Sequence, residues 1–412
     1  METKDVVIVS ACRTGIGKFL GEFKNTSART LAMTAGSEAI KRAGIKPEDV
    51  DEIVMGECFT AMQGSLPARQ VGMRIGMRED SDACTVNQNC ASAMRALEIA
   101  CNDIQLGKTE IGLALGVENM TMAPFVLPKA RMGYRMGSIP NEGGAELYDS
   151  MLHDGLYDSL SNGHMGVTAD NVAKKYGITR EECDKLAVQS HTRAAKATEE
   201  GKFKDEIVPV IQKKRKHGKE IELVLDKDEH FIPDCNYETI SKFKPVFTKD
   251  GVTTAPNASG INDGAAALIV MSADKAKELG IKPMAKMLNI CYAGVAPEYM
   301  GIGPAYAIPR CLKGAGVDFK DVDYFEINEA FAAQFLGAKK ILKDEFGMDV
   351  PADRCNLNGS GIALGHPVGC SGIRIIVTML YEMKRHPDWK IGCASLCVGG
   401  GPAMASLWEL CD

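Results

Sequence analysis

The chain has 412 residues, 45% of them hydrophobic and 25% charged, which is ordinary for a folded globular protein of two or three domains. Its net charge of −6 argues against a general nucleic-acid-binding protein, although a local basic patch can still hold an anionic metabolite. No apolar stretch approaches the ~20 residues of a membrane span. The fourteen cysteines are scattered and include no Cys-x-x-Cys pair. We therefore expect reduced thiols and a cytoplasmic location, without a structural zinc site or a membrane partner.

The first part of the chain alternates apolar strands with helices. Short apolar runs typical of buried strands occur at residues 6–9, 53–55 and 111–115. Helical spacing covers residues 31–43 and stops at Gly44, a residue that favours a helix C-cap, and a second helix is expected at 91–104. Alternating strands and helices predict an α/β fold with parallel strands that are covered on both faces.

Residues 119–250 are richer in Met, Gly, His and charged residues, and they have no counterpart later in the chain. They include a helical stretch at 181–200 and a basic run at 213–219. Long insertions in compact domains are usually functional or disordered, and this segment has too many apolar positions for disorder. We expect an inserted loop domain that lies over the active site.

The remaining sequence contains an internal duplication. AIKRAGIKPEDVDEIVMGECF from Ala39 aligns without gaps with CLKGAGVDFKDVDYFEINEAF from Cys311, at an offset of 272 residues. Two further short matches follow in the same order, at offsets of 279 and 280. We expect two copies of one layered α/β fold related by a pseudo-twofold axis. The first half would comprise residues 1–118 and 251–282, the insertion 119–250, and the second half 283–412.

Cys90 stands directly before the helix expected at 91–104, with small residues behind it. A helix N-terminus favours the thiolate, so this position suits a nucleophile. A buried structural cysteine is the alternative.

Two further residues lie on turns near bare backbone amides, and a third ends a strand. His366 is flanked by Gly365 and Pro367, and an imidazole accepts a thiol proton at neutral pH. Cys397 ends an apolar run and precedes three glycines, whose amides make an oxyanion hole feasible. Asn328 ends a strand, where it either orients a water or oxyanion or is a polar strand end. For His366, a structural histidine is the alternative.

These residues lie in stretches that resemble the thiolase family, the acetyl-CoA C-acetyltransferases, along essentially the whole chain. The matching stretches are VNQNCASAMRA from Val86, GHMGVTADNVA from Gly163, NASGINDGAAA from Asn257, NEAFAAQ from Asn328, NLNGSGIALGHPVGCSG from Asn356 and CVGGG from Cys397. Any one of them is weak, whereas the combination in this order is highly specific. The resemblance implies a thiolase-like duplicated αβαβα layered fold of two pseudo-twofold-related halves plus a loop domain.

The resemblance also implies a role for each matched position. Cys90 would carry the acyl group, and His366 would deprotonate it and help to bind the thioester oxygen. Cys397 would move the α-carbon proton. Asn328 would hold a water in one oxyanion hole, and the amides of Cys90 and Gly399 would form the other. The positions implied to bind coenzyme A and the short acyl group are Leu156, His164, Met165, Phe247, Ala258, Ser259 and Phe331.

The implied reaction is the reversible Claisen condensation of two acetyl-CoA molecules to acetoacetyl-CoA and CoA, a step of fatty acid metabolism. The alternative is a thiolase for longer 3-ketoacyl-CoA substrates. CoA would be a substrate and product, with no cofactor and no metal. A decarboxylating ketosynthase would have a second histidine in place of Cys397, and an inactive acyl carrier is expected to lose Cys90 or His366.

The resemblance implies a homo-oligomer, a dimer or tetramer, with acyl-CoA partners and no nucleic acid. Residues 122–136, with Lys129, Arg131 and Arg135, fall where a tetramer contact is expected. The chain departs from the family in Ala91 and Ala93, where glycines are usual, and we expect their methyl groups to affect acyl size or rate. Ser360 interrupts a glycine pair, and residues 230–239 lack a basic residue often found near the adenine. We further expect the basic run at 213–219 to help hold the phosphates of CoA.

Overall fold

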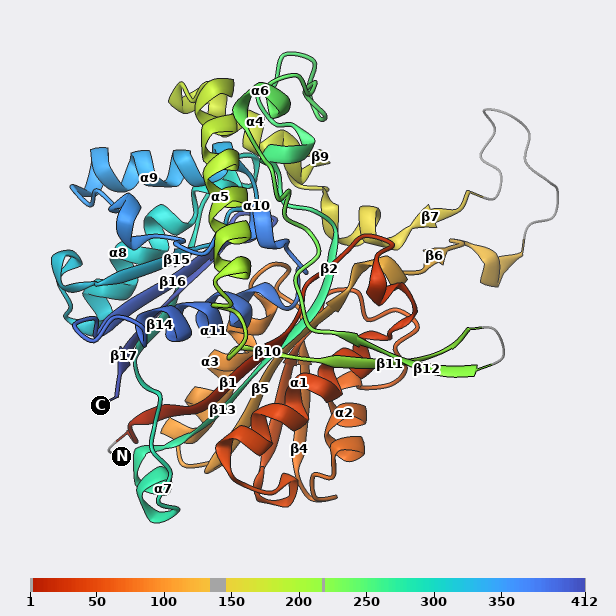
Figure 1. Cartoon of the computed structure of the whole chain (residues 1–412), viewed down its shortest axis with the longest axis vertical. Coiled ribbons are helices and arrows are strands. Elements are labelled where there is room, and N and C mark those ends of the chain that lie inside the picture. The colour runs from red at the N-terminus through yellow and green to blue at the C-terminus, as the bar shows by residue number, and fades with distance from the viewer. Residues whose placement is uncertain (1–2, 134–145, 217–218, 412) are drawn as a thin grey trace.

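A computed structural model of the protein describes residues 3–133, 146–216 and 219–411. Its core is one long mixed sheet that runs across the molecule, with helices on both faces (Figure 1). From one edge to the other the strands are β15 (Tyr324–Ile327), β16 (Ile391–Cys397), β17 (Pro402–Leu410), β14 (Ala285–Gly294), β1 (Val6–Thr14), β13 (Asn262–Ser272), β5 (Ile111–Asn119), β3 (Glu52–Gly56) and β4 (Asp82–Val86). Two short strands also join it, β2 (Gly17–Lys18) beside β13 and β10 (Ile207–Val208) beside β1.

The order of strands confirms the duplication. The two halves meet where β1 pairs antiparallel with β14, with Val7 opposite Lys286 and Ile8 opposite Ala285. Outward from this seam, the first half runs β13, β5, β3 and the second runs β17, β16, β15, and each series pairs antiparallel, antiparallel and then parallel. The sheet therefore has the same pattern on both sides of its centre, as a pseudo-twofold relation requires.

The expectation of parallel pairing is correct only for the outer strands and wrong for the central ones. In the second half, β16 turns back directly into β17 through residues 398–401, so these neighbours must run in opposite directions. In the first half, β13 enters the sheet after the long insertion and lies antiparallel to both β1 and β5. The periodicity of short apolar runs does not encode these directions.

Eleven α-helices lie among the described residues. They are α1 (Ala28–Ala43), α2 (Pro67–Ile75), α3 (Ser92–Gln105), α4 (Met165–Tyr176), α5 (Arg180–Glu199), α6 (Tyr237–Ile240), α7 (Ala273–Glu278), α8 (Pro304–Ala315), α9 (Ala332–Phe346), α10 (Gly361–Leu364) and α11 (Ser371–Met383). The helix predicted at 31–43 is confirmed, since α1 ends at Gly44 with a left-handed φ of 71°. It begins earlier than predicted because Ser27 caps it by accepting a hydrogen bond from the Thr30 amide.

The layers can be followed in the alternation of side chains along each strand. Leu268 and Val270 of β13 face the central helices α3 and α11, whereas Ala267 and Ile269 face α1 and α2. In the second half, the odd-numbered positions of β17 such as Leu407 face α8 and α9. Helices thus lie outside and between the two halves of the sheet, which is the expected αβαβα layering.

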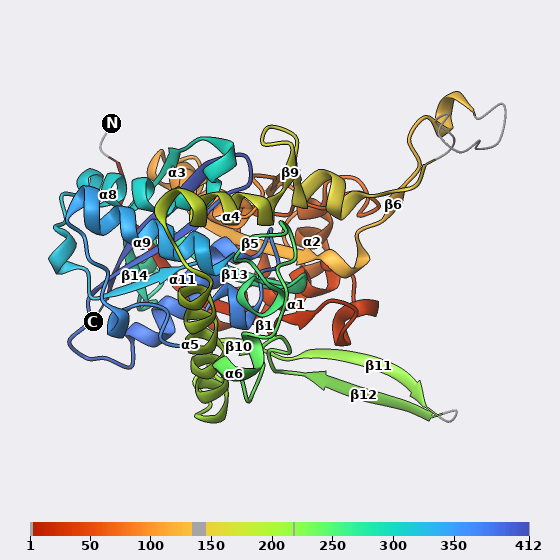
Figure 2. The ribbon, with the colours of Figure 1, turned by 90° about the horizontal axis from the view of Figure 1, so that it is seen from above.

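The segment 119–250 contributes α4 and α5, which pack against α9 and α10. It also contributes two projections. One is an arm in which β6 (Phe125–Val126) pairs with β7 (Tyr148–Asp149), and the other is the hairpin of β11 (Val210–Lys216) and β12 (Lys219–Leu225). Both extend away from the body of the molecule (Figure 2). Arg135 of the expected tetramer contact lies outside the described residues, whereas Lys129 and Arg131 are exposed on the arm. The proposed division at residues 118, 250 and 282 stays a prediction.

No helix among the described residues is both long and apolar enough to cross a membrane.

Candidate active site

A cavity of about 420 Å³ opens where the ends of the two halves meet the inserted segment. Its wall includes Cys90 of the first half, His366 and Gly399 of the second, and all seven positions proposed to bind substrate. Two predicted site residues, Asn328 and Cys397, are fully buried behind this wall. The fold therefore gathers residues that lie more than 300 positions apart in the chain.

The Cys90 thiol stands on a turn held from several sides. The preceding Asn89 has a left-handed φ of 46°, and its side-chain amide donates to the Gly399 carbonyl at 3.2 Å. Ser92, the first residue of α3, donates its hydroxyl to the Asn89 carbonyl at 2.7 Å. These contacts fix Cys90 immediately before the helix, as expected, and tie it to the second half.

Burial decides the protonation state of Cys90. It raises the pKa of the thiol to about 11, although hydrogen bonds from the backbone amides of Gly399 and Cys90 itself lower it. The expected lowering by the helix N-terminus is therefore outweighed, because buried, largely apolar surroundings solvate a thiolate poorly. The free thiol is protonated at neutral pH and needs a base.

His366 is a base in the required form. Its Nδ1 lies 2.6 Å from the hydroxyl of Ser371, and that hydroxyl donates to the Pro367 carbonyl at 3.0 Å. A hydroxyl has one hydrogen to donate, so Ser371 accepts from Nδ1–H, and the lone pair of the neutral ring lies on Nε2. Burial, together with the charge of Arg374, lowers the pKa of His366 to about 3, so the ring is neutral.

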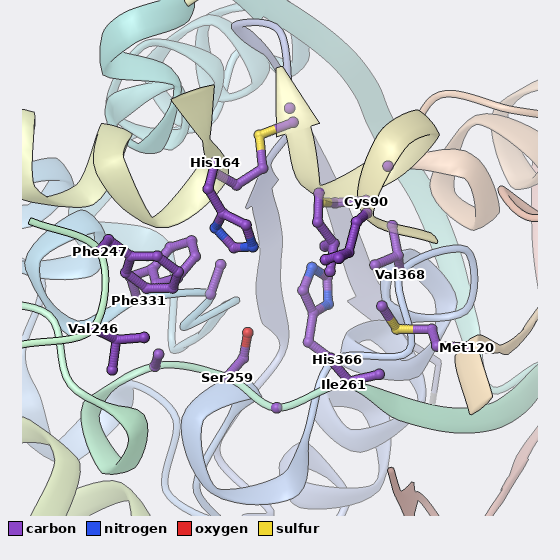
Figure 3. A pocket seen from close by; sticks show the side chains of 18 of the residues that line it. Cys90, Met120, His164, Val246, Phe247, Ser259, Ile261, Phe331, His366 and Val368 are labelled. Atoms are coloured by element: carbon purple, nitrogen blue, oxygen red, sulfur yellow. The ribbon is translucent and has the colours of Figure 1, made fainter. Parts of the chain in front are cut away.

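The position of the ring is also fixed. The His366 amide donates to Asn262 Oδ1 at 2.9 Å, and Gly365 before it has a φ of 101°. A Cβ on Gly365 would lie 2.6 Å from the Asn262 side chain, so glycine is required there. Nε2 is buried and has no partner among the described residues. Figure 3 shows the imidazole turned toward Cys90.

Cys397 ends β16 and is fully buried. Burial raises the pKa of its thiol well above the ordinary value, and the nearby charge of Cys90 raises it further. The following turn carries Gly400 and Gly401 with φ values of 90° and 106°. A side chain on Gly401 would collide with the Val295 carbonyl at 2.2 Å. The glycines let this turn bring the Gly399 amide to Cys90.

Asn328 follows β15 directly. Its backbone amide donates to the Ser395 carbonyl at 2.9 Å, and its Oδ1 accepts from Arg374 at 3.5 Å. Its Nδ2 is buried without a partner among the described residues, as is Nε2 of His366. Buried polar atoms of this kind normally have a partner, so two donors or acceptors remain for a water or a substrate oxygen.

The outer part of the cavity is an aromatic and apolar slot. The rings of His164 and Phe247 stack with centroids 4.5 Å apart, and Phe331 meets Phe247 edge-on at 6.1 Å. Another part of the wall is the backbone of Ala258 and Ser259, which forms a β-bridge with Phe331 and a hydrogen bond to the Ala330 carbonyl, just before α9. A thin chain with few charges fits such a slot.

Sequence reasoning missed part of the wall. Some of the missed residues adjoin a recognised motif, and sequence proximity was enough to find them: Asn89, Gly260, Ile261, Ala330 and Val368. Others are brought in by the fold alone and carry no local signal: Met120, Leu152, Gly155, His230, Val246, Thr254, Ala255 and Met300.

The departures from the family can be placed in the structure. Ala91 and Ala93 do not line the cavity, because their methyl groups are buried in the central core between α3 and α11. The geometry gives no support to an effect on acyl size, and an effect on rate stays a prediction. Ser360 is compatible with its turn, because its φ of −141° is accessible to any residue, whereas Gly359 has a φ of 76°.

The described part of the basic run, residues 213–216 and 219, belongs to strands β11 and β12. Among the described residues, none from this hairpin lines the cavity, and the side chains of residues 214–220 lie outside the described part. The structure gives no support to its role in binding phosphate.

Comparison with known proteins gives consistent results. The family model described as "Thiolase, N-terminal domain" matches residues 6–274, and "Thiolase, C-terminal domain" matches residues 281–410. The chain is 47% identical to an acetyl-CoA acetyltransferase of Cupriavidus necator, over 97% of this chain and 98% of the relative.

Two solved structures cover both chains almost completely. The structure of acetyl-CoA acetyltransferase from Syntrophomonas wolfei is 52% identical, with a TM-score of 0.96 over 100% of each chain. The crystal structure of human mitochondrial 3-ketoacyl-CoA thiolase is 36% identical, with a TM-score of 0.92 over 99% of each chain.

Proposed function

Since the chain belongs to the thiolase family, we propose that it condenses two acetyl-CoA molecules to acetoacetyl-CoA and CoA and catalyses the reverse thiolysis. The observation that carries the proposal is the gathering of a protonated Cys90, a neutral His366 with a free Nε2, and a buried Cys397 around one cavity. This is the set of groups that covalent acyl transfer followed by carbon–carbon bond formation needs.

In the first step, Nε2 of His366 takes the Cys90 proton as the sulfur attacks the thioester carbon of acetyl-CoA. The carbon–sulfur bond to CoA breaks, and His366 gives the proton to the leaving sulfur. The products are acetyl-Cys90 and CoA. Because the free thiol is mostly protonated, proton transfer and attack are coupled, which makes the tautomer set by Ser371 important.

In the second step, Cys397 loses its proton to His366, and the thiolate removes a proton from the methyl group of a second acetyl-CoA. The resulting carbanion attacks the acetyl carbon on Cys90, and the departing Cys90 sulfur recovers the proton from His366. Atoms and protons balance over the cycle.

Negative charge that develops on the thioester oxygens has two sets of donors. The amides of Cys90 and Gly399 already point at the sulfur and form one set. Nε2 of His366, when protonated, and a water held by Asn328 form the other. Such preorganised donors in a dry cavity stabilise an oxyanion strongly. The aromatic slot would hold the pantetheine arm of CoA, which is substrate and product here.

The test is thiolysis of acetoacetyl-CoA by the purified protein with added CoA. The ultraviolet band of the magnesium complex of acetoacetyl-CoA should disappear, and two acetyl-CoA should form for each molecule consumed. A series of longer 3-ketoacyl-CoA substrates measured in parallel decides the alternative. Faster turnover of the longer substrates would replace the proposed substrate, and no turnover of any of them would reject the function.

We also propose a homo-oligomer, a dimer or tetramer. The arm formed by β6 and β7 exposes Phe125, Leu127 and Leu147, and β4 leaves one edge of the sheet open. Sedimentation equilibrium tests the state directly. The cytoplasmic location stays a prediction.

A further inference from the structure

Glu118, at the C-terminal end of β5, is a fully buried carboxylate that bridges two loops from opposite halves of the protein. Its Oε2 accepts hydrogen bonds from the backbone amides of Cys58 at 3.0 Å and Gly369 at 2.8 Å. Its Oε1 accepts from the backbone amide of Phe59 at 3.1 Å. One side chain thus holds the loop after β3 and the loop after His366 at a fixed distance.

Each of these loops leads to a reactive group. On one side, the Cys58 thiol lies 3.2 Å from the carbonyl of Asn89 and 3.3 Å from the hydroxyl of Ser92, the residues that flank the Cys90 turn. On the other side, Gly369 follows His366 by three residues. The contact at Gly369 is too close for any side chain, since a Cβ there would lie 2.6 Å from Glu118 Oε2.

Backbone amides stabilise the charge of Glu118. Burial raises its pKa to about 7, while the amides of Phe59, Cys58 and Gly369 lower it. The titratable groups that sense its charge are Glu57, Cys58, Cys90 and Cys370, and Glu118 raises the pKa of each. Because three amide donors from two loops bind its two oxygens, the carboxylate acts as a clamp that holds the two loops together.

We propose that Glu118 is a positioning residue that sets the spacing between Cys90 and His366. The inference rests on the proposed function, in which His366 takes the Cys90 proton. Glu118 does not line the cavity and touches no substrate, so it acts through Cys58 and Gly369. A small error in the spacing of two reacting groups costs on the order of 10²-fold in rate.

The test is Glu118→Gln, which has nearly the same shape. Its NH₂ group must face at least one backbone N–H, so at least one of the three amides loses its acceptor. We expect kcat for thiolysis and the rate of Cys90 alkylation by iodoacetamide each to fall by about 10- to 100-fold. Both rates are measured below the pKa of about 7 of Glu118, where its carboxyl is mostly protonated, because loss of its charge would by itself lower the pKa of Cys90 and speed alkylation. The Michaelis constant for acetoacetyl-CoA should stay within about twofold, because the slot is untouched. Peptide mapping identifies the alkylated cysteine.

The matched control is Glu52→Gln. Glu52 is also a buried carboxyl of this sheet, with a pKa raised to about 7 by burial, but it lies at the far end of β3 and bonds to Thr109. The Glu52→Gln variant should have the wild-type kcat and the wild-type rate of Cys90 alkylation. Thermal melting of both variants separates a loss of folding from a loss of positioning.

The outcomes decide the proposal in every case. A folded Glu118→Gln protein with wild-type kcat and alkylation overturns it, as does a change in the Michaelis constant alone. If Glu118→Gln does not fold, Cys58→Ala takes its place, because it removes the contacts of the thiol with Asn89, Ser92 and Glu118 and keeps the backbone amides that bind the carboxylate. Slower Cys90 alkylation in that variant supports the clamp, and an unchanged rate overturns it. Alkylation needs no acyl-CoA, so a failure of the proposed function would be seen separately in the wild-type protein.

Discussion

Replacing Ser371 with Ala should disable His366 without touching the substrate. In the wild-type protein, the Ser371 hydroxyl accepts from Nδ1–H at 2.6 Å in a site where both residues are buried. Removing it leaves a buried donor unpaired, at a cost of about 1–3 kcal/mol. The ring can avoid this cost by moving its proton to Nε2, which is the atom that must receive the Cys90 proton.

Returning the ring to the tautomer with its lone pair on Nε2 costs this same free energy, and the loss in rate can be calculated from it. At about 1.4 kcal/mol per factor of ten, acylation of Cys90 should slow by about 5- to 150-fold. Rapid acid quenching after mixing with acetyl-CoA measures acylation directly. Ser371 does not line the cavity, so the Michaelis constant should hardly change.

The control for this variant is Ser406→Ala. Ser406 is a fully buried serine of β17 whose hydroxyl has no partner among the described residues, so its removal should cost nothing in rate. Acylation in Ser371→Ala within about twofold of wild type would refute the assignment of the tautomer.

Three further predictions concern the same site. His366→Ala should slow both acylation and condensation, whereas Cys397→Ala should still acylate Cys90 but fail to form the carbon–carbon bond. Each affected step should slow by about 10²–10⁴-fold. Near-normal condensation by Cys397→Ala, measured as acetoacetyl-CoA formed, would contradict the role of Cys397. Mild oxidant should inactivate the enzyme and dithiothreitol restore it, because Cys90 and Cys397 lie close enough to sense each other's charge; inactivation with both cysteines unlinked in a peptide map would refute a disulfide between them. Burial, with the charge of Glu118, raises the pKa of Glu57 from 4.5 to about 9, so the folded chain keeps a proton that the unfolded chain loses. Between the unfolded pKa of 4.5 and the folded pKa of about 9, Glu57 should lower the free energy of unfolding by about 1.4 kcal/mol per pH unit. The stabilisation by Glu57→Gln should therefore grow between pH about 6 and about 8.5 in urea titrations, and a gain independent of pH would show that Glu57 does not titrate there.

The sequence predicted those parts of the site in which the role of a residue depends on its neighbours in the chain. Cys90 before a helix, Gly44 after one, and His366 between Gly365 and Pro367 are local patterns, and each lies where it was expected. The internal repeat predicted the two halves for the same reason, since it can be read without a structure.

What the sequence did not predict depends on pairs that are distant in the chain. Glu118 meets Gly369 across 251 positions, and although Gly369 lies in a recognised stretch, nothing local indicates that the two residues pair. The pKa of Cys90 is raised by burial in the folded protein, and this effect outweighs that of the helix N-terminus visible in the sequence. The methyl group of Ala93 fits into the core because Gly116 leaves room for it, which requires the packed sheet to be known.

The central claim is that Cys90 carries the acyl group, and its most direct test is the mass of the peptide that contains it. After brief incubation with acetyl-CoA and quenching in acid, one acetyl group should be found on Cys90, and added CoA should remove it. Cys90→Ser should show no acetyl thioester on any cysteine. An acetyl thioester on another cysteine, or full turnover by Cys90→Ser, would contradict the mechanism.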